Sequence, residues 1–201
     1  MANMSRTDDR QARLEQALRA NLRRRKAIPA GDAAPAGPPA EPAPPAPPRK
    51  LDLNAVPEES GCRYPAPFDG PVKARRFRRL GAAAGLTQFG VNLVTLPPGC
   101  WSSQRHWHAV DDEFVWVVSG ELVLVTDAGE QPMGVGDCAA FKGGERDGHH
   151  LQNRSAADAV FLVVGGRGDG DWGEYSDIDM AFRPGRYAAP GGYVRKSGEP
   201  Y

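Results

Sequence analysis

The sequence predicts an all-β domain, an antiparallel sandwich or barrel, preceded by an N-terminal extension of different composition. After Leu51, short runs rich in β-branched and aromatic residues recur between turn residues, with little helical periodicity. Before Leu51, residues 29–48 hold nine of the 19 prolines. The remaining length, about 150 residues, is enough for one buried core. We therefore expect residues 1–50 to form an arm and linker, and residues 51–201 to form the domain.

The first element of the extension is a predicted helix over residues 7–27. Thr7 is a suitable N-cap, and the last turn is basic, which favours the helix dipole. Leu14, Leu18 and Leu22 recur every four residues. This stripe is too narrow to stabilise an isolated helix, so we interpret it as a weak docking face.

The second element is a Pro/Ala-rich linker over residues 29–48, which we expect to be disordered because it cannot bury enough apolar surface to fold. Residues 1–50 carry ten Lys/Arg against five Asp/Glu, and the remainder carries fifteen against twenty. The neutral chain thus combines a basic arm with an acidic domain. No helix-turn-helix pattern accompanies the arm. We expect a solvated tail and no nucleic-acid partner; contact of the arm with a nucleic acid or an acidic partner is the alternative.

The domain itself is predicted from alternating or β-branched runs bounded by glycine and other turn residues. Ser119-Gly120 is a tight turn between two such runs, which indicates a hairpin. The expected strands, in chain order, are residues 72–80, 87–96, 104–109, 113–119, 121–126, 131–135, 138–142, 149–153 and 159–164.

All four histidines fall in two short clusters, the first of which is His106-Trp107-His108. Side chains alternate faces along a strand, so His106 and His108 point the same way and Trp107 points opposite. Two imidazoles on one face can share one ion. Glu113 opens the next apolar run and can add a carboxylate from a neighbouring strand. We expect Trp107 and Trp116 to be packing residues.

The second cluster is His149-His150, after a glycine-rich loop over residues 142–148. Adjacent residues face opposite sides of a strand, so we expect only one of the two histidines to enter the barrel.

The spacing HxHx4Ex6G, followed by a Gly-Asp turn, a strand and Hx3N, resembles the two motifs of the cupin superfamily over roughly residues 72–166. The segments HWHAVDDEFVWVVSGE, GHHLQNRS, YSDIDM and RKSGEPY resemble single-domain bacterial cupins of the sugar-phosphate-isomerase-like group. The resemblance implies a double-stranded β-helix, a jelly-roll barrel with its core over residues 72–166, followed by a tail over residues 167–201.

The resemblance also implies a three-histidine, one-glutamate site for a divalent Mn, Fe, Ni or Zn ion. His149 is preferred to His150 because it keeps the three-residue gap to Asn153. Lys142 stands where the family usually has proline, and the loop to His149 is two residues longer than its minimal form. Neither departure changes a ligand. The implied ligands are His106, His108, Glu113 and His149.

Four protein ligands leave coordination positions open for a small-molecule ligand. Isomerisation of a sugar or sugar phosphate fits, as does dioxygenation or decarboxylation; a non-enzymatic sensor is the third alternative. Isomerisation needs a base, and the sequence identifies none. Charged or polar side chains beside the second motif could meet the substrate, although such residues are more often merely solvated: Lys142, Arg146, Arg154 and His150.

Cys62, Cys100 and Cys138 are odd in number and lack C-x-x-C spacing, and the chain shows neither an apolar signal segment nor a membrane-spanning run. We expect a cytoplasmic protein.

A homodimer is also expected, because the edge strands of a small sandwich must be covered or paired. The C-terminal tail offers apolar residues that could cover an edge within the subunit or across a two-fold axis: Ile178, Met180, Phe182, Tyr187 and Tyr193.

Overall fold

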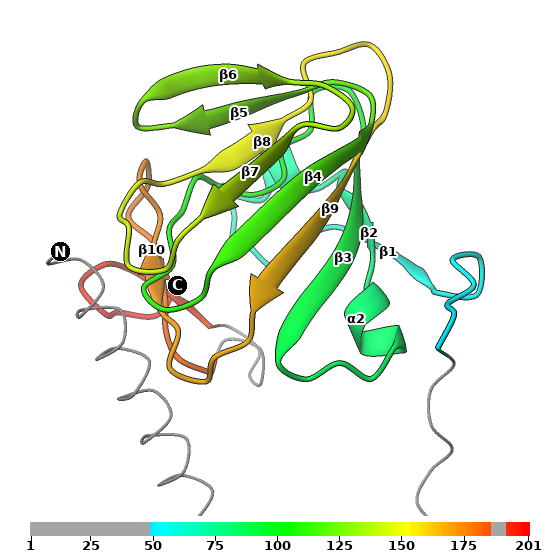
Figure 1. The fold of residues 1–201 in the computed structure, drawn as a ribbon. Helices are drawn as coiled ribbons and strands as arrows, with labels where there is room; N and C mark the ends of the chain where they lie inside the picture. The colour runs from blue at the N-terminus through cyan, green and yellow to red at the C-terminus, as the bar shows by residue number, and fades with distance from the viewer. Residues whose placement is uncertain (1–48, 186–191) are drawn as a thin grey trace, which may run out of the picture. The chain divides into compact units, whose positions relative to one another are not determined.

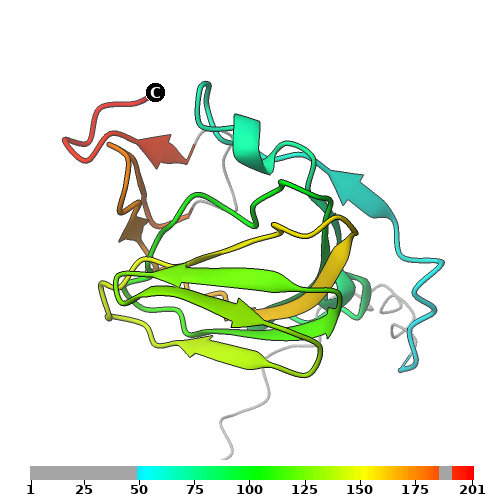
Figure 2. The same cartoon turned by 90° about the horizontal axis from the view of Figure 1, so that it is seen from above.

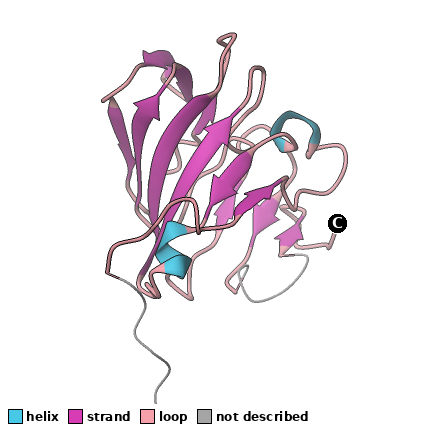
Figure 3. Ribbon diagram, turned by 90° about the vertical axis from the view of Figure 1, so that its right-hand side faces the viewer, coloured by secondary structure: helices cyan, strands magenta, loops and turns pink. Residues whose placement is uncertain are grey.

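The structure is a computed structural model that describes residues 49–185 and 192–201. Strands and loops make up nearly all of this part of the chain (Figure 3), and its helices are the short η1 (Gly70–Val72) and α2 (Leu80–Ala83). The helix expected over residues 7–27, the Pro/Ala-rich linker and Tyr187 lie outside the described residues.

Two antiparallel sheets form the barrel (Figure 1). The larger sheet has the order β1 (Glu58–Ser60), β2 (Arg76–Arg78), β3 (Phe89–Leu96), β9 (Ala159–Gly166), β4 (Glu113–Ser119) and β7 (Cys138–Phe141). The smaller sheet has the order β6 (Gly129–Met133), β5 (Leu122–Thr126) and β8 (His150–Gln152). Strands distant in sequence are neighbours, as when β9 lies between β3 and β4, and the all-β jelly-roll prediction is confirmed.

The core lies between the two sheets and follows the alternation of strand residues. In β4, Val115 and Val117 point inward and are buried, whereas Phe114, Trp116 and Val118 point outward and are 42%, 46% and 45% exposed. Trp107 is buried against Trp172, as expected of a packing residue. The packing role expected of Trp116 is wrong, because its strand parity directs it to the outer face.

Of the nine expected strands, residues 113–119 form a strand with the expected bounds, six others form with shifted ends, and two do not form as expected. Over residues 72–80 the chain forms only β2, because a 3-10 turn that starts at Gly70-Pro71 precedes it and α2 follows it. Residues 104–109 make only isolated bridges at His106 and form no regular strand.

The tail folds back as a third sheet, β10 (Gly173–Glu174), β11 (Ala181–Phe182) and β12 (Tyr193–Val194). Met180 and Phe182 are fully buried in this cluster. The centroids of the Tyr64 and Tyr193 rings lie 5.1 Å apart, so the segment between β1 and β2 runs beside the red C-terminal strand (Figure 2). The apolar tail therefore packs within its own chain. None of the described helices is long and apolar enough to cross a membrane.

Candidate metal centre

The centre begins with a backbone pair, His106 and His149. Each residue donates its N–H to the carbonyl of the other, at 3.2 and 2.9 Å. Directly opposed residues of an antiparallel pair project to the same side, and the two imidazole centroids lie 5.3 Å apart. His108, two residues further along, has its ring centroid 5.0 Å from that of His106. The three imidazoles therefore face one space.

Glu113, the first residue of β4, brings a carboxylate to the three imidazoles. Its Oε1 lies 3.5 Å from Nε2 of His149, and its Oε2 lies 4.0 Å from Nε2 of His108. One ligand atom from each of His106, His108 and Glu113 can be chosen so that all lie within 4.8 Å of one another. The structure thus brings together the four residues proposed as ligands from the sequence.

Hydrogen bonds at Nδ1 orient two of the imidazoles. Nδ1 of His106 lies 3.0 Å from the carbonyl oxygen of Gln104, and Nδ1 of His108 lies 2.8 Å from Oδ2 of Asp171. A carbonyl and a carboxylate only accept hydrogen bonds, so Nδ1 carries the proton in both rings. In the neutral imidazole Nε2 then holds the lone pair that a metal ion requires.

Asp171 is the functional residue that the sequence did not reveal. It is 3% exposed, and its Oδ1 accepts hydrogen bonds from the backbone N–H groups of Val110 and Asp111. Burial by itself raises the pKa of Asp171, but the hydrogen bond and charge of His108 and the two N–H groups together lower it by more, so the net pKa is below its usual value. Asp171 stays ionised and holds His108 in place.

His149 provides the test of whether these residues fit a metal ion. Both of its ring nitrogens are buried and have no hydrogen-bond partner within the described residues. Its ring stacks on that of Phe141, with centroids 3.5 Å apart and planes 2° from parallel. A buried nitrogen without a hydrogen bond destabilises the fold, and a cation bound between Nε2 of His149 and the Glu113 carboxylate would remove that cost for Nε2. Three imidazoles and one carboxylate suit a first-row divalent ion, so the residues fit.

His150 is buried beside His149 but makes different contacts. Its Nδ1 donates to the carbonyl of Ser103 at 3.0 Å, and its Nε2 lies 2.8 Å from the amide nitrogen of Gln152. Burial lowers the pKa of His150, which favours the neutral ring. The prediction that only one of the two histidines enters the barrel is wrong, since both line the same cavity. The chain changes its pairing partner between them: His149 pairs with His106, and His150 pairs with Val125 of β5.

The three cationic side chains expected at the substrate do not line that cavity. Arg154 pairs with Glu130 through two hydrogen bonds of 2.7 and 2.6 Å. Arg146 lies over the ring of Trp107, 5.1 Å from its centroid. Lys142 borders a smaller space of about 250 Å³ that also touches His108 and His149.

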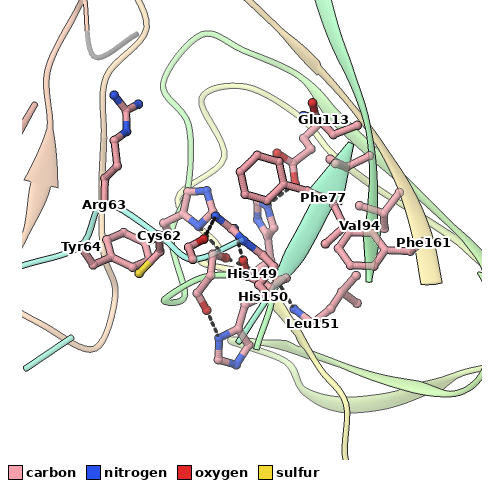
Figure 4. A pocket seen from close by; sticks show the side chains of 18 of the residues that line it. Cys62, Arg63, Tyr64, Phe77, Val94, Glu113, His149, His150, Leu151 and Phe161 are labelled. Atoms are coloured by element: carbon pink, nitrogen blue, oxygen red, sulfur yellow. Dashed lines mark hydrogen bonds and ion pairs between the residues drawn. The ribbon is translucent and has the colours of Figure 1, made fainter. Parts of the chain in front are cut away.

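The ligand cluster opens into a cavity of about 440 Å³, within the range typical of small-molecule sites. Glu113 and His149 project into it, with Val94 and Phe161 on one wall (Figure 4). Arg63 and Tyr64 lie at the other side, on the segment before β2 (Figure 4). Burial raises the pKa of Tyr64 far above its usual value, so its hydroxyl stays protonated. The cavity is apolar at one wall and polar at the other.

A double-stranded β-helix with three histidines and a glutamate at one cavity is typical of metal-binding barrel proteins. Similarity to known proteins points to the same class. A family model described as Cupin domain matches residues 92–165. A sugar phosphate isomerase of the cupin superfamily from Silicibacter pomeroyi DSS-3 is 48% identical, with a TM-score of 0.72, over 76% of this chain and 96% of that chain. The chain belongs to the cupin superfamily.

A second solved structure is similar over a smaller share of the chain. This protein from Acidithiobacillus ferrooxidans ATCC 23270, provisionally called a sugar phosphate isomerase, is 30% identical, with a TM-score of 0.53, over 55% of this chain and 70% of that chain. No curated protein matches the sequence. The resemblance to the sugar-phosphate-isomerase-like group is confirmed.

Proposed function

We propose that this cupin binds one divalent metal ion and isomerises a small oxygenated substrate, a sugar or sugar phosphate. The observation that carries the proposal is the convergence of four ligand-type side chains at the cavity of about 440 Å³: His106, His108, Glu113 and His149. The names of the two similar proteins support the substrate class. A bound ion would act as a Lewis acid on a substrate oxygen.

The surrounding residues prepare the ligands for that role. Asp171 and the Gln104 carbonyl fix the protonated Nδ1 atoms, so that Nε2 of His108 and of His106 face the centre. The ring of Phe141 covers one side of His149 and restricts its rotation. A geometry fixed before the ion arrives reduces the conformational entropy lost on binding.

Moving a proton between neighbouring carbons requires a group that can accept it, and we propose His150. It lines the cavity, and burial keeps it neutral by lowering its pKa. Because Nδ1 donates to Ser103, the lone pair is on Nε2, which now accepts from the Gln152 amide. Rotation of that amide would release the lone pair to a substrate.

Metal analysis and turnover by paired variants test the proposal. Wild-type protein should contain one divalent ion and interconvert an aldose phosphate and a ketose phosphate. His149→Ala should lose both metal and turnover. His150→Asn, its neighbouring control, should keep the metal and lose only turnover. If the loaded protein instead consumes O2 with a diketone or thiol, a dioxygenase function replaces the isomerase. Ligand binding without turnover would make it a sensor.

We also propose a cytoplasmic location. Cys62, Cys100 and Cys138 are all free thiols in the structure, as is usual in a reducing compartment. Fractionation of the native cells tests this location. Detection of the protein mainly outside the cytoplasmic fraction would contradict it.

A further inference from the structure

Four arginines lie in and beside strand β2, and they face two different sides: Arg76 and Arg78 belong to the strand, and Arg75 and Arg79 flank it. Arg75 and Arg79 line the cavity on either side of Phe77, with their guanidinium carbons 5.3 and 4.9 Å from its ring centroid. Arg76 and Arg78 take the opposite parity and do not line the cavity. Arg76 pairs with Asp158 at 2.5 Å, and Arg78 pairs with Glu58 at 3.4 Å.

Arg79 is already neutralised by a carboxylate. Its Nε and Nη2 donate to the two carboxylate oxygens of Glu59 at 2.7 and 3.2 Å. This two-pronged pair is the strongest geometry available to a guanidinium and a carboxylate. Arg79 is therefore occupied at the cavity wall.

Arg75 has no such partner. Within residues 49–185 and 192–201, no carboxylate lies within 4.0 Å of its guanidinium, which donates only to the carbonyl oxygens of Ser102 at 2.5 Å and Gly61 at 3.5 Å. Its Nε is buried and has no hydrogen-bond partner among the described residues. A half-buried cation bonded only to neutral carbonyls retains donors and a charge to offer an anion.

Arg75 is also tied to the segment that contacts the metal ligands. Ser102, its acceptor, precedes Ser103, whose Oγ lies 3.4 Å from Nδ1 of His106. Arg75 and His106 line one cavity, and Arg63 adds a third, exposed arginine to its lining beside Arg75 and Arg79. The two carbonyl contacts fix the guanidinium in place before any ligand binds.

We propose that Arg75 binds an anionic oxygen group of the substrate, phosphate or carboxylate, in the cavity that the metal ligands also line. The proposal rests on the proposed function, because it names the chemical class of substrate for the same cavity. It assigns to Arg75 the role that the sequence suggested for Lys142, Arg146 and Arg154. Planar guanidinium donors match both kinds of oxyanion.

Titration calorimetry tests the proposal with inorganic phosphate and, separately, acetate as probes. Both are added to the full chain with and without its metal ion. Arg75→Gln should weaken binding of the preferred anion about tenfold or more, since one charge-assisted hydrogen bond is lost at a site shielded from water. Arg75→Lys keeps the charge and should weaken it less. Arg76→Gln, an equal charge change one residue away, should leave it unchanged.

The preferred probe decides between a phosphate and a carboxylate end. The proposal is overturned if wild-type protein binds neither anion, or if Arg75→Gln and Arg76→Gln bind equally while both melt as wild type does. Binding by the metal-free protein separates this site from direct contact with the ion. If anion binding depends on Arg75 but the protein turns over no sugar phosphate, the proposed reaction is contradicted and the anion site is supported.

Discussion

Oδ2 of Asp171 lies 2.8 Å from Nδ1 of His108, although 63 positions separate the two residues. Oδ1 of the same carboxylate accepts from two backbone N–H groups, so each oxygen has a separate task. Asp171 therefore joins the segment after β9 to the candidate metal centre.

Asp171→Asn should weaken metal binding about 10- to 100-fold, the usual cost of losing a carboxylate behind a ligating histidine. If the amide oxygen keeps the two backbone N–H groups, the NH2 group faces His108 and moves its proton to Nε2, which blocks the lone pair. Metal affinity measured by competition with a chelating dye checks this. Asp169→Asn, at an exposed position two residues earlier, is the control, and equal affinities in the two variants would contradict the prediction.

Arg105, next to His106 in the chain, forms ion pairs with Asp127 and Asp177. We expect the pair with Asp177 to make the free energy of unfolding depend on pH. The hydrogen bonds that Arg105 donates, at 2.9 and 2.6 Å, lower the pKa of Asp177. A lowered folded-state pKa stabilises the protein above the unfolded value, near 4, and this contribution is lost as pH falls through the folded value.

Asp177→Asn should therefore reduce the free energy of unfolding at pH 7 by about 0.5 to 1 kcal/mol, a small amount because the carboxylate is 55% exposed. The difference should shrink below about pH 4. Urea unfolding across pH measures it. In an Arg105→Gln background the substitution should cost almost nothing, and a cost that persists there would assign the effect to another contact.

We propose that the expected homodimer forms through the outer face of β4 instead of the tail. Phe114, Trp116 and Val118 expose apolar surface there, while Met180 and Phe182 of the tail are fully buried. If this face packed against the same face of a second copy, the apolar surface of both subunits would be removed from water. Trp116→Glu should yield monomers in light scattering, whereas Leu53→Glu, at an exposed apolar position before β1, should not. A monomeric wild-type protein at micromolar concentration would remove the proposal.

Removing residues 1–50 should shift the melting temperature by less than about 3 °C and leave metal content unchanged. The described core begins with Val56, and the four proposed ligands lie after residue 100. Calorimetry and metal analysis of the shortened chain check this. A much larger loss of stability would show that the stripe of Leu14, Leu18 and Leu22 packs on the barrel.

Most strands of the barrel and the four proposed ligands could be predicted from local sequence patterns. Strand β4 was predictable because its apolar run is bounded by Glu113 and a turn at Gly120. The ligands were predictable because their spacing matches the two motifs. Asp171 was not predictable, because it lies in a glycine-rich segment without periodicity and its role depends on a contact across the fold. Arg75 was hidden for the same reason, since only the three-dimensional arrangement distinguishes it from the ion-paired arginines around it.

The mutual hydrogen bonds between His106 and His149 have a consequence for how metal affinity responds to heat. The same pair of backbone hydrogen bonds holds two of the four proposed ligands, so any motion that breaks this pair separates half of the ligand set at once. Ion release should then follow local opening of this backbone pair and precede global melting. A metal-reporting dye would register a transition at lower temperature than circular dichroism does, and the difference between the two temperatures would measure the stability of the His106–His149 pair relative to that of the whole fold.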